Sequence, residues 1–188
     1  MIDRPDSWQA IALRVPSLVV LVGAAGAGKS TFAARQFRAD EVLSSDAFRA
    51  RLSGDAADQR RSRTVFALLH REASKRLAAG RLVVIDATSV ERHARTALVS
   101  LARAAGVPAV AIVLALPPQV VQERNAQRTE RVVDAAVVER HLAALAVALG
   151  EVGIAAEGFD AVHVLRSVAA VDEAVVERRL GPPETGRG

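Results

Sequence analysis

Short apolar runs alternate along this chain with longer segments in which apolar residues recur at every third or fourth position. The short runs predict β-strands at residues 18–22, 41–45, 81–86, 108–116 and 159–165. The periodic segments predict helices at residues 30–38, 64–79, 91–105, 117–131, 134–149 and 168–180. This alternation favours an α/β fold, with a mostly parallel central sheet of about four to five strands and helices on both faces.

The two ends of the chain fall outside this alternation. Residues 1–16 form a lead-in with a short helix that Ser7 is suited to cap. The side chains with which this helix would pack on the domain are Trp8, Ile11 and Leu13. Residues 181–188, with the sequence GPPETGRG, predict a disordered tail. We therefore assign the folded domain to residues 17–180, a length that suits one domain with a substantial core.

The first apolar run leads directly into a segment that fits G-x-x-x-x-G-K-[ST], and a predicted helix follows. This order of strand, glycine-rich loop and helix is the context in which the motif binds phosphate. Glycines let backbone N–H groups approach a polyphosphate closely, and the helix N-terminus adds a positive dipole. The residues predicted to bind the nucleotide are Gly23, Ala24, Ala25, Gly26, Ala27, Gly28, Lys29, Ser30 and Thr31.

The last part of the motif supplies charge and a metal ligand. Lys29 is predicted to reach the β- and γ-phosphates, and the hydroxyl group of Ser30 to ligate Mg²⁺. We therefore expect ATP or GTP, bound with Mg²⁺, as the phosphate donor. Parallel sheets bind ligands beyond the carboxyl ends of their strands. This rule groups the phosphate loop with residues 44–49, residues 86–89 and the segment after residue 116 around one cleft.

Two acidic residues follow predicted strands at this edge. Asp46 is placed either to align an acceptor hydroxyl and take its proton or to cap the helix that begins there. Asp86 is predicted either to hold Mg²⁺, through Ser30 or water, or to cap the following loop. On sequence grounds these roles can be exchanged between Asp46 and Asp86. Arg49, three residues after Asp46, is predicted to hold an acceptor phosphate or to form an ion pair with Asp46.

Arginine supplies almost all of the positive charge. The formal net charge is +4, and the lysines are Lys29 and Lys75. Because arginine suits phosphate recognition, this balance indicates either a polyanionic substrate or a general bias of composition. In the segment ERNAQRTER, Arg124, Arg128 and Arg131 are spaced to form either a clamp on the phosphates or an exposed basic helix face.

The remaining composition narrows the class of protein. The chain has no cysteine, which excludes disulfides and thiolate metal sites. No apolar segment approaches the length of a membrane span and no signal peptide is visible, so we expect a cytoplasmic protein. The histidines have no metal-ligand spacing and are interpreted as structural or surface residues. They are His70, His93, His141 and His163.

Several short motifs occur in a fixed order along nearly the whole chain. They are SSDxxR at 44–49, DQ at 58–59, LH at 69–70, KRLAAGRL at 75–82, VIDATSV at 84–90, AR at 94–95, ERNxxRTxR at 123–131 and EGF at 157–159. Together with the phosphate loop, they resemble the 5′-OH polynucleotide kinase domain of bacterial polynucleotide kinase-phosphatase enzymes. Each motif alone is weak, whereas their joint order and spacing are specific.

The resemblance implies an adenylate-kinase-like P-loop phosphotransferase that uses ATP and Mg²⁺ and has a helical lid at about residues 119–149. It implies that Asp46 is the general base for the 5′-hydroxyl and that Arg49 grips the 3′-phosphate of the acceptor. The lid arginines carried over by position are Arg124 on the ATP phosphates, and Arg128 and Arg131 in the nucleotide pocket.

The chain departs from the family's pattern on the acceptor side. Ala47 and Phe48 stand where the family usually has an aromatic residue and a cysteine, and Ser89 replaces the asparagine of the DATN signature. The phosphatase and adenylyltransferase-like modules usually joined to the kinase are absent from the sequence. A separate phosphatase or ligase is therefore a partner to look for.

These features favour ATP-dependent transfer of the γ-phosphate to the 5′-hydroxyl end of RNA or DNA. One alternative is a small-molecule kinase of the same fold that acts on a sugar, nucleoside or antibiotic hydroxyl. Another is a nucleotide-gated binding module that has the phosphate loop but no catalytic base, against which Asp46 counts.

Overall fold

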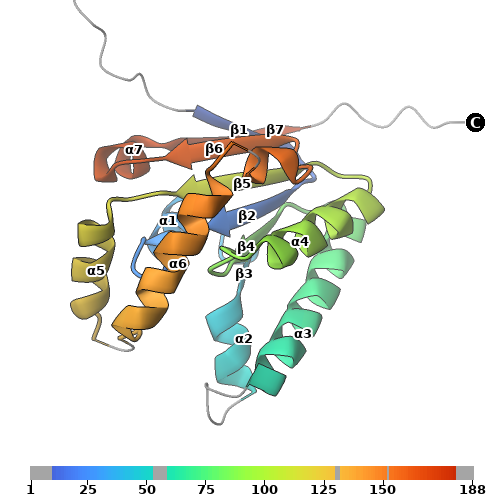
Figure 1. Cartoon of the computed structure of the whole chain (residues 1–188). Helices are drawn as coiled ribbons and strands as arrows, with labels where there is room; N and C mark the ends of the chain where they lie inside the picture. Colours follow the sequence, from blue (N-terminus) through green and yellow to red (C-terminus); the bar gives the residue numbers. More distant parts are fainter. Residues whose placement is uncertain (1–9, 53–58, 130–131, 152, 181–188) are drawn as a thin grey trace, which may run out of the picture.

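A parallel sheet lies at the centre of the part of the chain that the computed structural model describes, residues 10–52, 59–129, 132–151 and 153–180 (Figure 1). Within these residues the sheet has five strands in the order β3-β4-β2-β5-β6, and all neighbouring strands are parallel. The strands are β2 (Leu18–Val22), β3 (Val42–Ser44), β4 (Val83–Asp86), β5 (Ala109–Leu114) and β6 (Ala161–Leu165). The predicted α/β fold with a parallel central sheet is confirmed.

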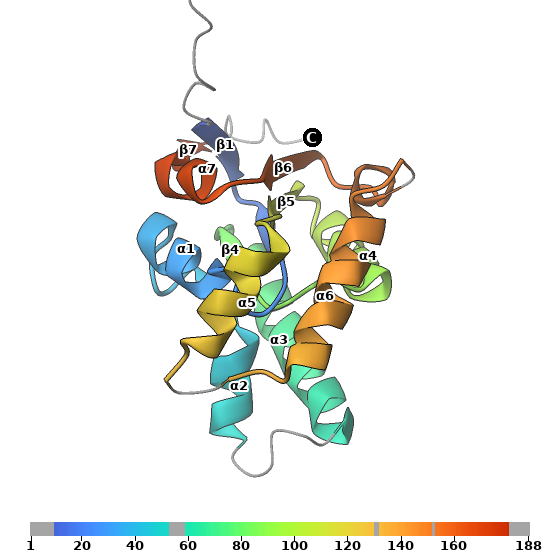
Figure 2. The same cartoon turned by 60° about the vertical axis from the view of Figure 1, so that its left-hand side comes forward.

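Helices cover both faces of this sheet. In the described residues they are α1 (Lys29–Gln36), α2 (Ser45–Arg51), α3 (Gln59–Ala78), α4 (Arg92–Ala104), α5 (Pro118–Ala126), α6 (Ala135–Ala148), the 3-10 helix η1 (Ile154–Ala156) and α7 (Val168–Glu173). Helices α3 and α4 pack on one face, and α1 and α7 pack on the other (Figures 1 and 2). Among the helices that the structure describes, none is both long enough and apolar enough to cross a bilayer.

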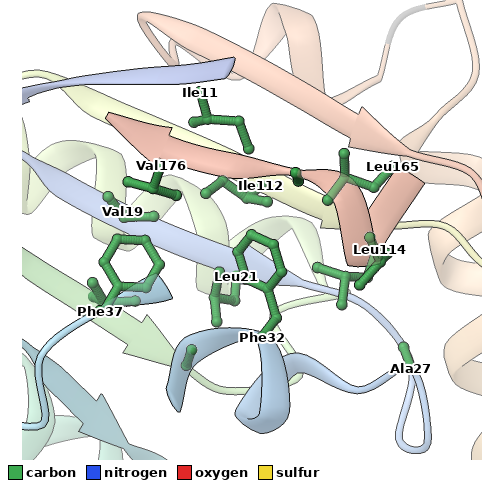
Figure 3. Packing of buried hydrophobic residues seen from close by; sticks show 14 of the residues in the cluster. Ile11, Val19, Leu21, Ala27, Phe32, Phe37, Ile112, Leu114, Leu165 and Val176 are labelled. Atoms are coloured by element: carbon green, nitrogen blue, oxygen red, sulfur yellow. The ribbon is translucent and has the colours of Figure 1, made fainter. Parts of the chain in front are cut away.

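The alternation of side chains along β2 divides the core into two clusters. Val19 and Leu21 point to the face covered by α1, where they share a buried cluster with Phe32 (Figure 3). Leu18 and Val20 belong to the cluster on the opposite face, beneath α3 and α4. Successive side chains of a strand point to opposite faces, and both faces are covered here. Every position of β2 is therefore apolar and buried.

Two segments that were expected to be helical form a second, small sheet. β1 (Ala10–Val15) pairs in parallel with β7 (Val175–Leu180), and Ile11 lies opposite Val176. Both side chains are buried in the cluster on the α1 face of the central sheet (Figure 3). The two ends of the described chain are thereby tied to the domain and to each other.

The helix predicted for the lead-in is wrong for Ile11 and Leu13, which lie in β1, while Ser7 and Trp8 lie outside the described residues. The helix predicted at residues 168–180 is wrong beyond α7, because Ala174 adopts extended backbone angles (φ −60°, ψ 133°) and the chain continues as β7. Each strand has its hydrogen-bonding partner at the other end of the sequence, and local periodicity contains no information about such a partner.

Two other predicted segments fall partly or wholly outside the described residues. The polar stretch at residues 53–62, whose sequence predicts a loop and the start of a helix, is described only from Gln59 onward, where α3 has already begun. The tail at residues 181–188 lies outside the described part of the chain, so its disorder stays a prediction.

The carboxyl ends of β2, β3 and β4 meet at one edge of the sheet. In the strand register, Asp86 is the partner of both Leu21 and Ser44. The N–H of Gly23, directly after β2, donates to the carbonyl of Thr88 at 3.1 Å. The strand arrows point toward this edge in Figure 1, on the side where α5 lies. The phosphate loop, the start of α2 and the loop after β4 therefore lie next to one another.

Candidate active site

The phosphate loop has a backbone that only glycine adopts without strain at two positions. Gly26 and Gly28 have φ angles of +91° and +89°. A Cβ atom on Gly26 would also lie 2.5 Å from the backbone oxygen of Val121 in α5. Gly28 is the N-cap of α1, so the unpaired N–H groups of this helix open onto the loop. The loop thus has the shape and the donors that a phosphate chain requires.

Lys29 is buried at the base of this loop. Its Nζ atom donates hydrogen bonds of 2.8 Å to the carbonyls of Gly23 and Ala24. Burial lowers the pKa of Lys29 to about 8 because it disfavours the cation, and the negative charge of Asp86 partly opposes this. The ammonium group is held close to its own loop, where it can donate to phosphate oxygens.

Ser30 and Asp86 form the polar pair that would bind a metal ion. The buried carboxylate of Asp86 accepts a hydrogen bond from the Ser30 hydroxyl. Burial raises the pKa of Asp86, while this hydrogen bond and the charge of Lys29 act in the opposite direction. The described residues contain no cluster of three or more His, Cys, Asp or Glu side chains that could hold a metal ion by themselves. This donor set fits Mg²⁺, which usually takes its other ligands from phosphates and water.

The start of α2 brings Asp46 and Arg49 to the same edge. Ser44 is the N-cap of this helix, and its Oγ accepts from the N–H of Ala47 at 3.4 Å. Asp46 is therefore not needed as the cap. Its carboxylate accepts a hydrogen bond of 2.7 Å from Nη1 of Arg49, so the predicted ion pair is present. The charge of Asp46 also acts on Lys29, which places this carboxylate near the phosphate loop.

A cavity of about 340 Å³ lies beside the phosphate loop. Its lining residues come from the loop, α1, α5, the segment after α5, and α7. They are Gly26, Gly28, Lys29, Ser30, Thr31, Phe32, Arg35, Arg124, Arg128, Val171 and Asp172. The structure therefore brings Arg124 and Arg128 to the phosphate loop. Nη1 of Arg124 would lie 3.4 Å from a Cβ on Gly28, which places this guanidinium directly beside the loop.

The predicted helical face of three arginines is only partly correct. Helix α5 ends at Ala126, with Gln127 as its C-cap, so Arg128 lies beyond the helix rather than one turn along it. Arg131 lies outside the described residues. The roles predicted for these arginines and for the other site residues stay predictions, because geometry alone does not test them.

Sequence patterns missed the part of this cavity that α7 supplies. Arg35 of α1 forms an ion pair of 3.1 Å with Asp172 of α7 and also donates to the carbonyl of Val171. No local signal in the sequence links these residues, because they lie far apart along the chain. Asn125 was also missed as a link between α5 and the segment before α6. Its side chain donates to the carbonyl of Val133 at 2.7 Å and accepts from the N–H of Val133 at 3.1 Å.

Comparison with known proteins gives one family match. A family model described as an AAA domain matches residues 18–148. No curated protein sequence matches the chain. Among solved structures, an unliganded sugar kinase from Janibacter sp. HTCC2649 is similar, with 22% identity and a TM-score of 0.58 over 80% of this chain and 85% of that chain. Kti12 from Chaetomium thermophilum, in complex with ADP-AlF3, has 15% identity and a TM-score of 0.60 over 84% of this chain and 94% of that chain.

A protein of the Pnkp1/Rnl/Hen1 RNA repair complex is also similar, with 23% identity and a TM-score of 0.62. The similarity covers 71% of this chain but 45% of that chain, so the present chain spans less than half of its length. At such identities these similarities establish the fold, which is that of P-loop kinases. They do not identify the phosphate acceptor, because the similar proteins include both a sugar kinase and a protein of an RNA repair complex.

Proposed function

This chain is a member of the AAA-domain family, and we propose that it transfers the γ-phosphate of ATP to the 5′-hydroxyl end of a polynucleotide. The observation that supports this most strongly is the position of Asp46. Asp46 lies in the first turn of α2 beside the phosphate loop, and its charge acts on both Lys29 and Asp86. Arg49 lies 2.7 Å from it. This pair suits an acceptor nucleotide, because the carboxylate can take the proton of its hydroxyl group while the arginine binds its phosphate.

The proposed reaction is a direct transfer. Asp46 takes the proton of the 5′-hydroxyl while the hydroxyl oxygen forms a bond to the γ-phosphorus. The bond from this phosphorus to the bridging oxygen breaks, and ADP leaves with the electron pair. Lys29 and Arg124 stabilise the negative charge on the transferred group. Bound Mg²⁺, held through Ser30, would neutralise charge on the β- and γ-phosphates.

The remaining arginines divide between the two substrates. Arg49 holds the 3′-phosphate of the terminal nucleotide, because it lies on the acceptor side next to Asp46. Arg128 lines the cavity beside the phosphate loop. In this proposal it contacts the nucleotide donor. Arg131 belongs to the same nucleotide site in this proposal. A separate ligase would act on the ends that this kinase phosphorylates, and a separate phosphatase would act on 3′ ends.

A small-molecule alcohol is the second candidate acceptor. The similarity to the sugar kinase favours it, because that similarity extends over most of both chains, whereas the similarity to the RNA repair protein covers less than half of that protein. The pairing of Asp46 with Arg49 favours the polynucleotide, because a neutral sugar offers no phosphate to the arginine.

Transfer of labelled phosphate from ATP tests the proposal. The acceptors are RNA and DNA oligonucleotides with 5′-hydroxyl ends, the same oligonucleotides with 5′-phosphate ends, and a panel of sugars and nucleosides. We expect transfer to the 5′-hydroxyl oligonucleotides only, and its loss in Asp46→Asn and Lys29→Ala. Asp40→Asn is the matched control, because Asp40 is exposed and precedes β3 at the opposite end of the strand. Transfer to a small alcohol alone would replace the proposal with the second candidate.

A further inference from the structure

Arg95 of α4 is a fully buried arginine that the proposed reaction does not use. Two of its nitrogens, Nε and Nη2, donate to the carboxylate of Glu157. The third, Nη1, donates to the carbonyls of Ser89 and Val90. A buried ion pair is often no more stabilising than apolar side chains of the same volume. The pair with Glu157 therefore does not by itself account for an arginine here, and the contacts of Nη1 indicate a second role.

The loop that Nη1 contacts, residues 87–90, contains a strained residue. Ser89 has a φ of 47°, in the left-handed region that residues other than glycine adopt only at a cost. Such a conformation persists only where the surrounding structure enforces it. The hydrogen bonds from the charged guanidinium to the carbonyls of Ser89 (3.1 Å) and Val90 supply this constraint. Arg95 thus favours the one conformation of loop 87–90 that the backbone of Ser89 disfavours.

Loop 87–90 is also in direct contact with the phosphate loop. The N–H of Gly23, the first residue of the phosphate loop, donates to the carbonyl of Thr88 at 3.1 Å. The carbonyl of Gly23 in turn accepts from Nζ of Lys29 at 2.8 Å. Asp86, the last residue of β4, directly precedes loop 87–90 and is buried beside the phosphate loop. A continuous series of hydrogen bonds and short chain segments therefore connects the buried guanidinium to the groups that would bind ATP and Mg²⁺.

We propose that Arg95 is a positioning residue of the nucleotide site, which fixes loop 87–90 and through it the backbone of Gly23 and the carboxylate of Asp86. It does not touch the nucleotide. Loss of its contacts lets loop 87–90 relax, so that the first turn of the phosphate loop and the metal-binding pair are no longer held in the geometry for phosphate binding. The proposal rests on the proposed function only in that the phosphate loop binds ATP, and it does not depend on the acceptor.

Isothermal titration calorimetry of ATP with Mg²⁺ tests the proposal on Arg95→Lys. Lysine keeps the positive charge opposite Glu157, but its single nitrogen cannot also serve the two carbonyls of loop 87–90. We expect the Kd to rise by about tenfold, which is typical when a group that supports metal-binding residues is replaced. Thermal unfolding establishes that the variant is folded at the temperature of the titration.

Leu77→Ala is the matched control for a general loss of stability. Leu77 is buried in the same apolar cluster as Val90, but it lies near Pro108, which precedes β5, at the opposite edge of the sheet. A large-to-small change in the core destabilises the fold without touching loop 87–90. The Kd for ATP should therefore change by less than about twofold in Leu77→Ala.

Two further measurements separate positioning from a purely structural role. The amide ¹H and ¹⁵N chemical shifts of Gly23 report on its hydrogen bond to Thr88, and they should move in Arg95→Lys but not in Leu77→Ala. Ser89→Gly, added to Arg95→Lys, should restore part of the ATP affinity, because glycine adopts a positive φ without cost.

Unchanged ATP affinity in Arg95→Lys, an equal loss in Leu77→Ala, or an unmoved Gly23 amide would overturn the proposal. Should Arg95→Lys not fold, Glu157→Gln decides in its place, because it weakens the hold on the guanidinium and should move the same amide and raise the Kd. No change in either would overturn the proposal. A wild-type protein that binds ATP but phosphorylates no oligonucleotide would overturn the proposed function and leave this assignment testable. A wild-type protein that binds no ATP would overturn both.

Discussion

Arg95 and Glu157 form a buried, two-point ion pair that joins α4 to the segment before β6. Nε of Arg95 lies 2.6 Å from Oε2 of Glu157, and Nη2 lies 2.5 Å from Oε1. The side chains are only 2% and 3% exposed. Nη1 of Arg95 also donates to the carbonyls of Ser89 and Val90. Arg95 therefore holds the loop that follows Asp86 in place. Ser89, a residue of this loop, has a positive φ of 47°.

Replacement of Arg95 by methionine is expected to lower the free energy of unfolding by about 3–5 kcal/mol, because it leaves the carboxylate of Glu157 buried without its partner. Urea denaturation measures this change. Arg92→Met, at an exposed position of the same helix, should change the stability by less than about 0.5 kcal/mol. The double variant with Glu157→Met should be more stable than Arg95→Met alone. If Arg95→Met lowered the free energy of unfolding by less than about 1 kcal/mol, the buried pair would not be a major source of stability.

Replacement of Gly26 by alanine is expected to weaken ATP binding by at least about tenfold. The new Cβ would lie 2.5 Å from the carbonyl oxygen of Val121, and the left-handed backbone costs a further 1–2 kcal/mol or so. The loop must shift to relieve the contact, which moves its N–H donors. Isothermal titration calorimetry measures the Kd. Gly106→Ala is the matched control, because Gly106 also has a positive φ (67°) but open space around its Cβ position. Unchanged ATP affinity in Gly26→Ala would contradict the described loop geometry.

Replacement of Arg49 by alanine is expected to raise the KM for a 5′-hydroxyl oligonucleotide by about 10- to 100-fold, because a charged hydrogen bond to the acceptor phosphate is lost. The KM for ATP should change little, since Arg49 lies on α2, away from the cavity beside Arg124. Arg51→Ala, an exposed arginine at the end of the same helix, is the control. Equal losses for both substrates would argue against an acceptor contact.

Lys29 is expected to titrate with a pKa of about 8 in the protein free of nucleotide and metal, because burial disfavours its cation. Binding of ATP should raise this pKa, since phosphate charges favour the ammonium form. NMR of protein with ¹³Cε-labelled lysine follows this directly, because the chain contains only Lys29 and Lys75. Lys75→Arg assigns the signals. A Lys29 signal that shows no titration below pH 9.5 would contradict the environment described for the phosphate loop.

Lower stability in mild acid is expected from His70 and His163. Burial lowers the pKa of each below its ordinary value of 6.5, so the unfolded chain takes up protons first as the pH falls. The stabilising contribution of the neutral side chains is complete above pH 6.5 and is lost as the pH falls below that value. Thermal unfolding between pH 7.5 and pH 5.5 measures the slope. The double variant His70→Gln, His163→Gln should have a shallower slope, and an unchanged slope would exclude these residues as its source.

Local patterns were sufficient to predict the phosphate loop and the elements around it. The apolar run before Gly23 and the helix after Gly28 are present as β2 and α1. The parallel arrangement of the sheet then placed Asp86 and the start of α2 beside the loop, as the alternation of strands and helices implied. The role of Ser44 as the helix cap could not be separated from that of Asp46 in the sequence, because both residue types favour this position.

The class of fold, the phosphate loop and the grouping of Asp46 and Asp86 beside that loop were predictable from the order of residues along the chain. Each of these depends on residues that are close along the chain, because the spacing of apolar residues indicates whether a segment is a helix or a strand and which of its faces is buried. The pairing of β1 with β7, the ion pair of Arg95 with Glu157 and the contact of Arg35 with Asp172 became visible in the folded domain alone. These contacts join segments far apart in the chain, and burial together with strand register, rather than any local preference, selects their partners.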